Sequence, residues 1–259
     1  MQTTKLSRRH FLKLTAGLTI TTGIGSTINS CSTPYDWQNS LLNNDHSGHL
    51  TVNEIIGMAK INGKKIYRGN KLANNADISL LQGMLRLSLP DKSIIELNHK
   101  ATIKVDLDSK TGGMIHHKKG ALLSVIQKKT HRPLIIKSAD VQFGIRGTVC
   151  FTQILSDEDK LNSRVPQKAN SYFCICNGAM DYLDQQSQPF SKDRANHHSA
   201  HFLIPGKNQL ELQKTRFLLN HSDEQIYELI QKMEGKKHDT RWLFPKVSYY
   251  DSAKHSFLP

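Results

Sequence analysis

Short stretches in which apolar and polar residues alternate dominate the middle of the chain. Residues 85–89 read Leu-Arg-Leu-Ser-Leu, and residues 101–107 read Ala-Thr-Ile-Lys-Val-Asp-Leu. Because successive side chains of a β-strand point to opposite faces, this alternation predicts strands with one buried face. Further apolar stretches follow at residues 121–126, 134–137 and 141–145. A recurrence of roughly eight to twelve residues predicts a mainly β fold, either a β-sandwich or a β-solenoid of short strands.

Turn-forming residues separate these stretches. Asn62-Gly63 lies between two short alternating segments, which is a strong hairpin signal. Residues 90–93 read Pro-Asp-Lys-Ser and predict a turn between strands at 85–89 and 94–97. A second Asn-Gly pair, Asn177-Gly178, predicts a turn that ends a strand beginning at Ser171. Residues 189–196 are expected to form a loop.

One segment near the C-terminus has helical periodicity. Residues 222–233 begin with Ser222, a favourable N-cap, and acidic residues follow it in the first turn. Gly235 then ends the pattern. An apolar stripe runs along one side of this predicted C-terminal helix, at Ile226, Leu229, Ile230 and Met233. The tail after the helix is expected to be irregular.

The N-terminus carries the pattern of a bacterial twin-arginine export signal. Arg8 and Arg9 are adjacent, and a mildly apolar run rich in Thr and Gly follows over residues 14–28. The run is shorter and more polar than the roughly 20 apolar residues of a membrane span. We therefore expect a signal peptide over residues 1–30 and no transmembrane span. The export machinery of the twin-arginine route, which carries folded proteins, is the expected partner.

Cys31, shortly after this run, is consistent with two ways of processing the signal peptide. Cys31 follows Asn29 and Ser30, and a cysteine after an apolar stretch and a small residue is typical of lipoprotein attachment. Soluble cleavage near the same place is the alternative. Polar residues then predict a linker over residues 31–50. The protein is expected in the periplasm, either free or anchored to a membrane by a lipid on Cys31.

The charge of the chain narrows the classes of partner. Removal of residues 1–30 takes away four basic residues and no acidic one, which lowers the formal net charge from +13 to +9. The remaining charge favours an anionic ligand or an envelope component. Lysine and arginine are scattered, without a dense basic block interleaved with aromatic residues, so nucleic acid is not expected as a partner.

Three segments together resemble FecR domains. The first is the run from Gly57 through Asn62-Gly63 to Leu72, and the second is the hairpin at residues 85–97. The third is the apolar strand from Val141 that ends in Arg146, Gly147 and Thr148. The resemblance covers residues 57–155 and implies a β-rich fold with a role outside the cytoplasm.

The resemblance to FecR domains would imply a membrane-spanning regulator, because the proteins that gave the family its name relay iron-citrate uptake to a sigma factor. Such a relay needs a cytoplasmic segment and a membrane helix at the N-terminus. The export signal with Arg8 and Arg9 occupies that place here. We therefore expect an exported module without sigma-factor relay. Its predicted divisions are a FecR-like β domain at residues 51–155 and a C-terminal extension at residues 156–259.

The extension is similar to a narrower group of exported FecR-domain proteins. These carry Tyr-Phe-Cys-x-Cys, then His-His, then Asn-His-Ser/Thr-Asp before a helix. The matching residues here are Tyr172 to Cys176, His197 with His198, and Asn220 to Asp223. This similarity extends the resemblance to about residue 234.

Cys174 and Cys176 are the strongest candidates for chemistry. Residues i and i+2 of a strand face the same side, so both sulfur atoms can bind one ion. Imidazoles of His197, His198 or His221 would complete a site that suits zinc, copper or iron. A redox pair, a disulfide from Cys150 to either cysteine and simply buried thiols are the alternatives.

Two other groups of residues carry weaker signals. Arg146 offers a fork to a carboxylate, but Arg146, Gly147 and Thr148 are better explained as a strand end. His116 and His117 are interpreted as part of a solvated turn. The sequence contains no nucleophile elbow, phosphate-binding glycine loop or His-Glu-x-x-His motif.

The leading hypothesis is thus a non-enzymatic envelope module that binds a ligand or partner and possesses a metal site at the cysteine pair. A periplasmic redox or metalloenzyme that uses Cys174 and Cys176 is the second hypothesis. A purely structural envelope protein is the third. They differ in whether the thiols bind metal, exchange electrons or only pack.

Overall fold

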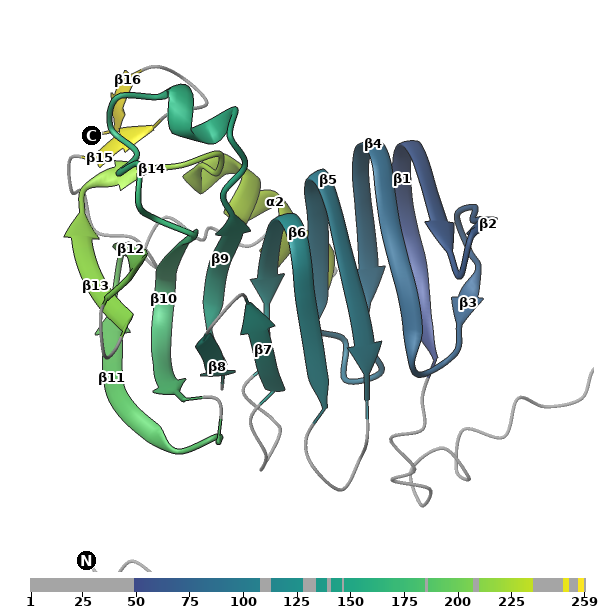
Figure 1. Cartoon of the computed structure of the whole chain (residues 1–259). Helices are drawn as coiled ribbons and strands as arrows, with labels where there is room; N and C mark the ends of the chain where they lie inside the picture. The colour runs from purple at the N-terminus through teal and green to yellow at the C-terminus, as the bar shows by residue number, and fades with distance from the viewer. Residues whose placement is uncertain are drawn as a thin grey trace, which may run out of the picture. The chain divides into compact units, whose positions relative to one another are not determined.

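β-Strands make up most of the described chain in the computed structural model (Figure 1). The structure describes residues 49–107, 113–127, 134–138, 141–145, 147–184, 186–206, 210–234, 249–251 and 256–258. Within these ranges there is one α-helix, α2 (Asp223–Glu234), near the C-terminus. The prediction of a mainly β fold with a C-terminal helix is therefore confirmed. The predictions for Arg8, Arg9, Cys31, Arg146 and residues 31–48 of the linker lie outside the described residues, and Leu50, the last residue of the predicted linker, already belongs to strand β1 (Leu50–Ile61).

Four long strands form an antiparallel row in the first part of the sheet. Their order is β1, β4, β5, β6. β1 and β4 are paired along nearly their whole length, whereas β4 with β5 and β5 with β6 are paired in both halves, with an interruption near the middle. They are longer than the short strands that the sequence predicted. Their bounds are β1 (Leu50–Ile61), β4 (Ala76–Ser88), β5 (Ile94–Asp106) and β6 (Met114–Val125).

The length of these strands is explained by a bend at the middle of each one. Figure 1 shows β1, β4, β5 and β6 curving over at the same end. Residues with positive φ lie near the middle of each strand, namely Gly57, Gly83, the pair His99 and Lys100, and Gly120. Both halves of each strand then contribute to one apolar core, for example Val52 and Ala59, Leu80 and Leu85, and Leu97 and Ile103. A single sheet thus encloses a sandwich-like core.

The second part of the sheet contains a closed ring of five strands. β9 pairs with one half of β6 and one half of β10, whereas β7 and β8 pair with the other halves. β7 and β8 also pair with each other, which closes the ring. The bounds are β7 (Leu134–Ser138), β8 (Val141–Ile145), β9 (Val149–Ile154) and β10 (Ser171–Leu183).

Shorter elements complete the described fold. β12 and β11 pair with successive parts of β10, and β13 pairs with β12. A small separate sheet joins β14, β15 and β16. The bounds are β2 (Lys64–Lys65), β3 (Lys71–Leu72), η1 (Asp159–Leu161), β11 (Pro189–Ala195), β12 (Ser199–Pro205), β13 (Leu210–Thr215), β14 (Phe217–Leu218), β15 (Tyr249–Asp251) and β16 (Ser256–Leu258).

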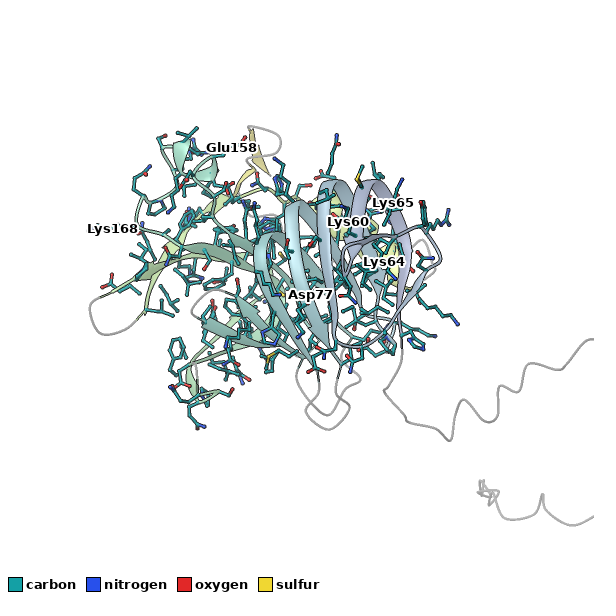
Figure 2. The ribbon with its side chains drawn as sticks, turned by 45° about the vertical axis from the view of Figure 1, so that its right-hand side comes forward. Lys60, Lys64, Lys65, Asp77, Glu158 and Lys168 are labelled. Carbon is teal, nitrogen blue, oxygen red and sulfur yellow. The ribbon has the colours of Figure 1, made fainter. Side chains whose placement is uncertain are left out.

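Both hairpins predicted in the first half of the chain are present. Asn62 and Gly63 have φ values of 46° and 80° and form the turn between β1 and β2. Lys60 of β1 pairs with Lys65 of β2 across this turn. Figure 2 shows Lys60, Lys64 and Lys65 together at this end of the sheet. The turn at residues 90–93 joins β4 to β5, with Ser88 opposite Ile94. These turns form as expected because their signals are local.

Several local predictions are wrong. Gly178 does not end a strand but lies inside β10, with a φ of 111°. Its missing side chain leaves room for Thr148, whose Oγ1 would be 2.9 Å from an added Cβ. The expected loop at residues 189–196 is largely strand β11, and the tail expected to be irregular contains β15 and β16. His117 is buried in β6 rather than in a solvated turn.

Helix α2 covers a second apolar core on the other face of the sheet. Ile226, Leu229 and Ile230 are buried there, as the periodicity predicted, together with Phe151 and Tyr172 of β9 and β10. The predicted cap is also present, because the Gln225 N–H donates to Ser222 Oγ at 3.4 Å. The side chain of Met233 lies outside the described residues. This second core contains the cysteine pair.

Candidate metal centre

The two cysteines project from one face of β10 into the second core. Cys174 lies opposite Phe151 of β9 and Ala200 of β12, and both thiols are fully buried. Cys176 follows two residues later on the same side, as strand geometry requires. The Sγ atom of Cys176 lies 3.8 Å from the carbonyl oxygen of Cys174. The pair is therefore held close together by the strand itself.

His198 approaches the pair from the corner between β11 and β12. Its N–H donates to the carbonyl of Cys176 at 3.2 Å, and its φ of 38° is in the left-handed region. Histidine is among the residues that adopt this conformation more readily than most. The resulting corner places Nδ1 of His198 3.2 Å from Sγ of Cys174.

His221 approaches the same point from the segment that precedes α2. Its Nδ1 lies 2.9 Å from the carbonyl oxygen of Leu219, so Nδ1 carries the proton and Nε2 has a free lone pair in the neutral ring. The ring stacks on Phe151, with centroids 4.4 Å apart. Nε2 is buried and has no hydrogen-bond partner among the described residues. A buried polar atom of this kind needs an explanation.

These four side chains bring their donor atoms to one place. The two sulfur atoms, one nitrogen of His198 and one of His221 all lie within 4.8 Å of one another, and all four residues are buried. Two thiolates and two imidazoles form a donor set that suits tetrahedral metal binding. A nitrogen that is to bind a metal ion needs an available lone pair, and the buried Nε2 of His221 has one. The residues present therefore fit a transition-metal ion.

Asp223 supports the site from outside this group. Its two carboxylate oxygens bind Nε2 of His198 at 2.7 Å and Nε2 of His197 at 3.0 Å. A carboxylate on the second nitrogen of a ligating imidazole fixes the orientation of the ring and increases its basicity. Asp223 was present in the sequence motif, but its supporting role was not predicted. The four-residue donor group does not include His197, which instead contacts Asp223.

Burial and ionic contacts shift the protonation of the site. Burial raises the pKa of the Cys176 thiol to about 12. Burial also opposes a charge on His198, but its hydrogen bonds to Asp223 and Cys176 prevail and raise its pKa to about 9. The two histidines hold the pKa of Asp223 well below its usual range, against the effect of burial. Metal uptake at neutral pH therefore requires loss of thiol and imidazolium protons.

Cys150 cannot serve as the disulfide partner that was considered for this pair. It lies opposite Ile175 in the register of β9 and β10, so its side chain is on the opposite face from Cys174. It packs in the first core, whereas Cys174 and Cys176 pack in the second. All three thiols are free. A bridge from Cys150 to either cysteine would require the strand to turn over.

Thr148 has a structural explanation. Its Oγ1 donates to the carbonyl of Ala179 at 2.7 Å, which ties β9 to β10 next to Gly178. Gly147 has a φ of 59°, which is a backbone conformation that favours glycine. The interpretation of Gly147 and Thr148 as part of a strand end therefore accounts for the hydrogen bond of Thr148 and the positive φ of Gly147. Neither lies in the donor group around Cys174.

The comparisons with known proteins concern the strands next to this site. No curated protein matches the chain. Among the described residues, no helix combines the length and the apolar character needed to cross a membrane. Residues 75–167 match the family model described as FecR protein, a range that runs from β4 past η1 and ends before the first cysteine of the pair. The resemblance to FecR domains is therefore confirmed for residues 75–167.

Proposed function

We propose that this protein is an exported, FecR-like envelope module that binds one transition-metal ion through Cys174, Cys176, His198 and His221. The match at residues 75–167 supports a role in the cell envelope or periplasm. The twin arginines, Arg8 and Arg9, support export by the twin-arginine route. Sigma-factor relay is not part of the proposal.

The single observation that carries the metal site is the position of His221. Its Nε2 is buried without a hydrogen-bond partner among the described residues, and one nitrogen of the same ring lies within 4.8 Å of two thiols and a second imidazole. Leaving such a group unsatisfied costs roughly 1–3 kcal/mol. A bound cation would satisfy the lone pair of His221 and would neutralise both thiolates. Metal binding would thus remove the free-energy penalty of the unpaired Nε2 of His221.

The test measures metal content in the mature protein purified from the periplasm without chelators. We expect about one metal ion per chain, and we expect the Cys174→Ser, Cys176→Ser double variant to lose it. Cys150→Ser is a matched control, because it removes a buried thiol from the opposite face of the same strands. Wild-type protein without metal, or equal loss of metal in the Cys150 variant, would contradict the proposal.

A second candidate function is a thiol-dependent enzyme. Cys174, His198 and Asp223 form a chain of contacts of 3.2 Å and 2.7 Å, in the order nucleophile, base and carboxylate. Burial opposes this function, because Cys174 is fully covered and a substrate cannot reach its sulfur without movement of the covering elements. Rapid reaction of Cys174 with a small alkylating reagent in the metal-free folded protein would favour the enzyme over the binding module.

A further inference from the structure

We propose that the ion in this site is a structural zinc ion that fastens the beginning of helix α2 to the sheet. The inference rests on the proposed function, since it assigns an identity and a task to the same metal site. Its support comes from the chain segments that supply the donors, from the closed donor set and from the separate anchorage of the other end of α2.

The donors come from three segments that are far apart in the sequence. Cys174 and Cys176 belong to β10, His198 belongs to the corner before β12, and His221 lies two residues before α2 begins. An ion bound to all four would therefore connect the helix start to two strands. The protein contacts that already hold this point include Asp223 on His197 and His198, and the Asn220 side chain, which donates to Gln153 Oε1 at 3.0 Å.

The donor set favours zinc in a structural role. Four protein donors fill a tetrahedral shell, whereas catalytic zinc sites keep a position for water or substrate. Two sulfur and two nitrogen donors are typical of structural zinc. All four residues are buried, with exposed fractions between 0% and 3%. The site thus lacks the open coordination position and the access that turnover would need.

The other end of α2 is held by contacts that do not involve the metal site. Glu228 binds Arg86 of β4 at 2.9 Å, and Lys232 binds Glu54 of β1 at 2.6 Å. Arg86 is itself buried and is also paired with Glu96 of β5. Loss of the ion should therefore loosen the helix from its beginning, near Asp223, while the ion pairs hold its later turns.

Hydrogen exchange of the full mature protein tests this inference. The zinc-loaded protein is compared with the same protein after chelation and again after zinc is restored. We expect amides at residues 217–226 to exchange roughly tenfold faster or more without zinc, and those at residues 227–234 to change much less. The remote hairpin of β1 and β2 should not change. Restored zinc should return the original rates.

Variants separate the inference from a general loss of folding. His221→Gln should reproduce the pattern of the chelated protein, with faster exchange at residues 217–226 that zinc no longer reverses. Cys150→Ala should respond to zinc as the wild type does. Because His221→Gln can also fail to fold, the wild-type comparison with and without zinc decides the case.

The outcomes distinguish this inference from the proposed function. If the protein binds no metal at all, both are contradicted. If it binds one ion at these donors but exchange at residues 217–226 is unchanged, only the structural role is overturned. If the bound ion is copper or iron rather than zinc, the assigned identity is overturned and the metal site remains.

Discussion

The carboxylate of Asp223 lies 2.7 Å from Nε2 of His198, on the side of the ring away from Cys174. This contact makes the first residue of α2 part of the candidate metal centre. The contact also favours a proton on His198, because hydrogen bonds to Asp223 and Cys176 raise the pKa of the imidazole to about 9 against the effect of burial. This hydrogen bond therefore links the start of the helix to the corner before β12.

Replacing Asp223 by Asn should weaken metal binding without removing a donor. The amide keeps the size of the side chain but loses its charge, so His198 becomes a poorer ligand. Loss of such an outer partner typically reduces metal affinity by roughly 10–100-fold. Competition with a chromophoric chelator measures the affinity. The control is Glu224→Gln, which removes an exposed acid from the next position; equal weakening in both variants would contradict the role of Asp223.

Burial of His117 should make the protein lose stability in mild acid. Burial lowers the pKa of this ring to about 4, although hydrogen bonds to backbone atoms oppose the shift. The neutral ring bonds Thr152 and the carbonyl of Lys119, both at 3.1 Å. Because the folded pKa is below the unfolded value of about 6.5, the stabilisation is complete above pH 6.5 and is lost as the pH falls toward 4.

The size of this loss is about 3 kcal/mol, from the difference between the two pKa values. Urea unfolding of the metal-free wild type between pH 7 and pH 4 measures it. His117→Gln removes the titrating group and should flatten the curve over this range. A variant curve as steep as that of the wild type would show that other groups cause the acid sensitivity.

The bend of the sheet should depend on Gly83. Its φ is +85°, and an added Cβ would lie 1.9 Å from the carbonyl oxygen of Ile56 in the neighbouring strand. Gly83→Ala should therefore lower the free energy of unfolding by about 2–4 kcal/mol, because backbone strain and a steric clash combine. Gly63→Ala is the matched control, since its φ is +80° but an added Cβ meets nothing within 4 Å. It should cost only about 1 kcal/mol. Denaturant unfolding that gives equal costs would contradict the close approach.

Export should depend on the paired arginines. An Arg8→Lys, Arg9→Lys double variant keeps the charge of the N-terminus but removes the twin-arginine pattern. We expect it to accumulate in the cytoplasm with its signal peptide uncleaved, whereas the wild type reaches the periplasm. Cell fractionation and mass spectrometry of the N-terminus measure both. A variant that is exported as well as the wild type would exclude this route.

The same mass spectrum decides the fate of Cys31. A lipid mass on Cys31 at the mature N-terminus would establish anchoring, and an unmodified N-terminus elsewhere would establish soluble cleavage. The two results place the module on a membrane or free in the periplasm.

The sequence predicted those parts of the fold that depend on neighbouring residues. Asn62-Gly63 forms its hairpin because both residues accept positive φ at a two-residue turn. The same residue pair at Asn177-Gly178 stays inside β10, because Gly178 leaves room for Thr148, which directly precedes β9 and is distant in sequence. Sequence reasoning could not distinguish these two pairs without knowledge of which strands lie side by side.

The candidate site also combines features that neighbouring residues determine with features that depend on tertiary contacts. The alternation along a strand was enough to put Cys174 and Cys176 on one face. Whether His197, His198 or His221 joins them depends on the corner before β12 and on the path into α2, which are tertiary features. In the structure, His198 and His221 group with the two cysteines, His197 groups with His198 and Asp223, and Cys150 lies on the opposite face.

X-ray absorption at the edge of the bound metal, measured on the protein as isolated from the periplasm, tests the central claim most directly. The account predicts a zinc edge with about two sulfur neighbours near 2.3 Å and about two nitrogen neighbours near 2.0–2.1 Å. It also predicts that the sulfur shell disappears in the Cys174→Ser, Cys176→Ser double variant. A shell of oxygen and nitrogen alone in the wild type, or no bound metal, would contradict the account.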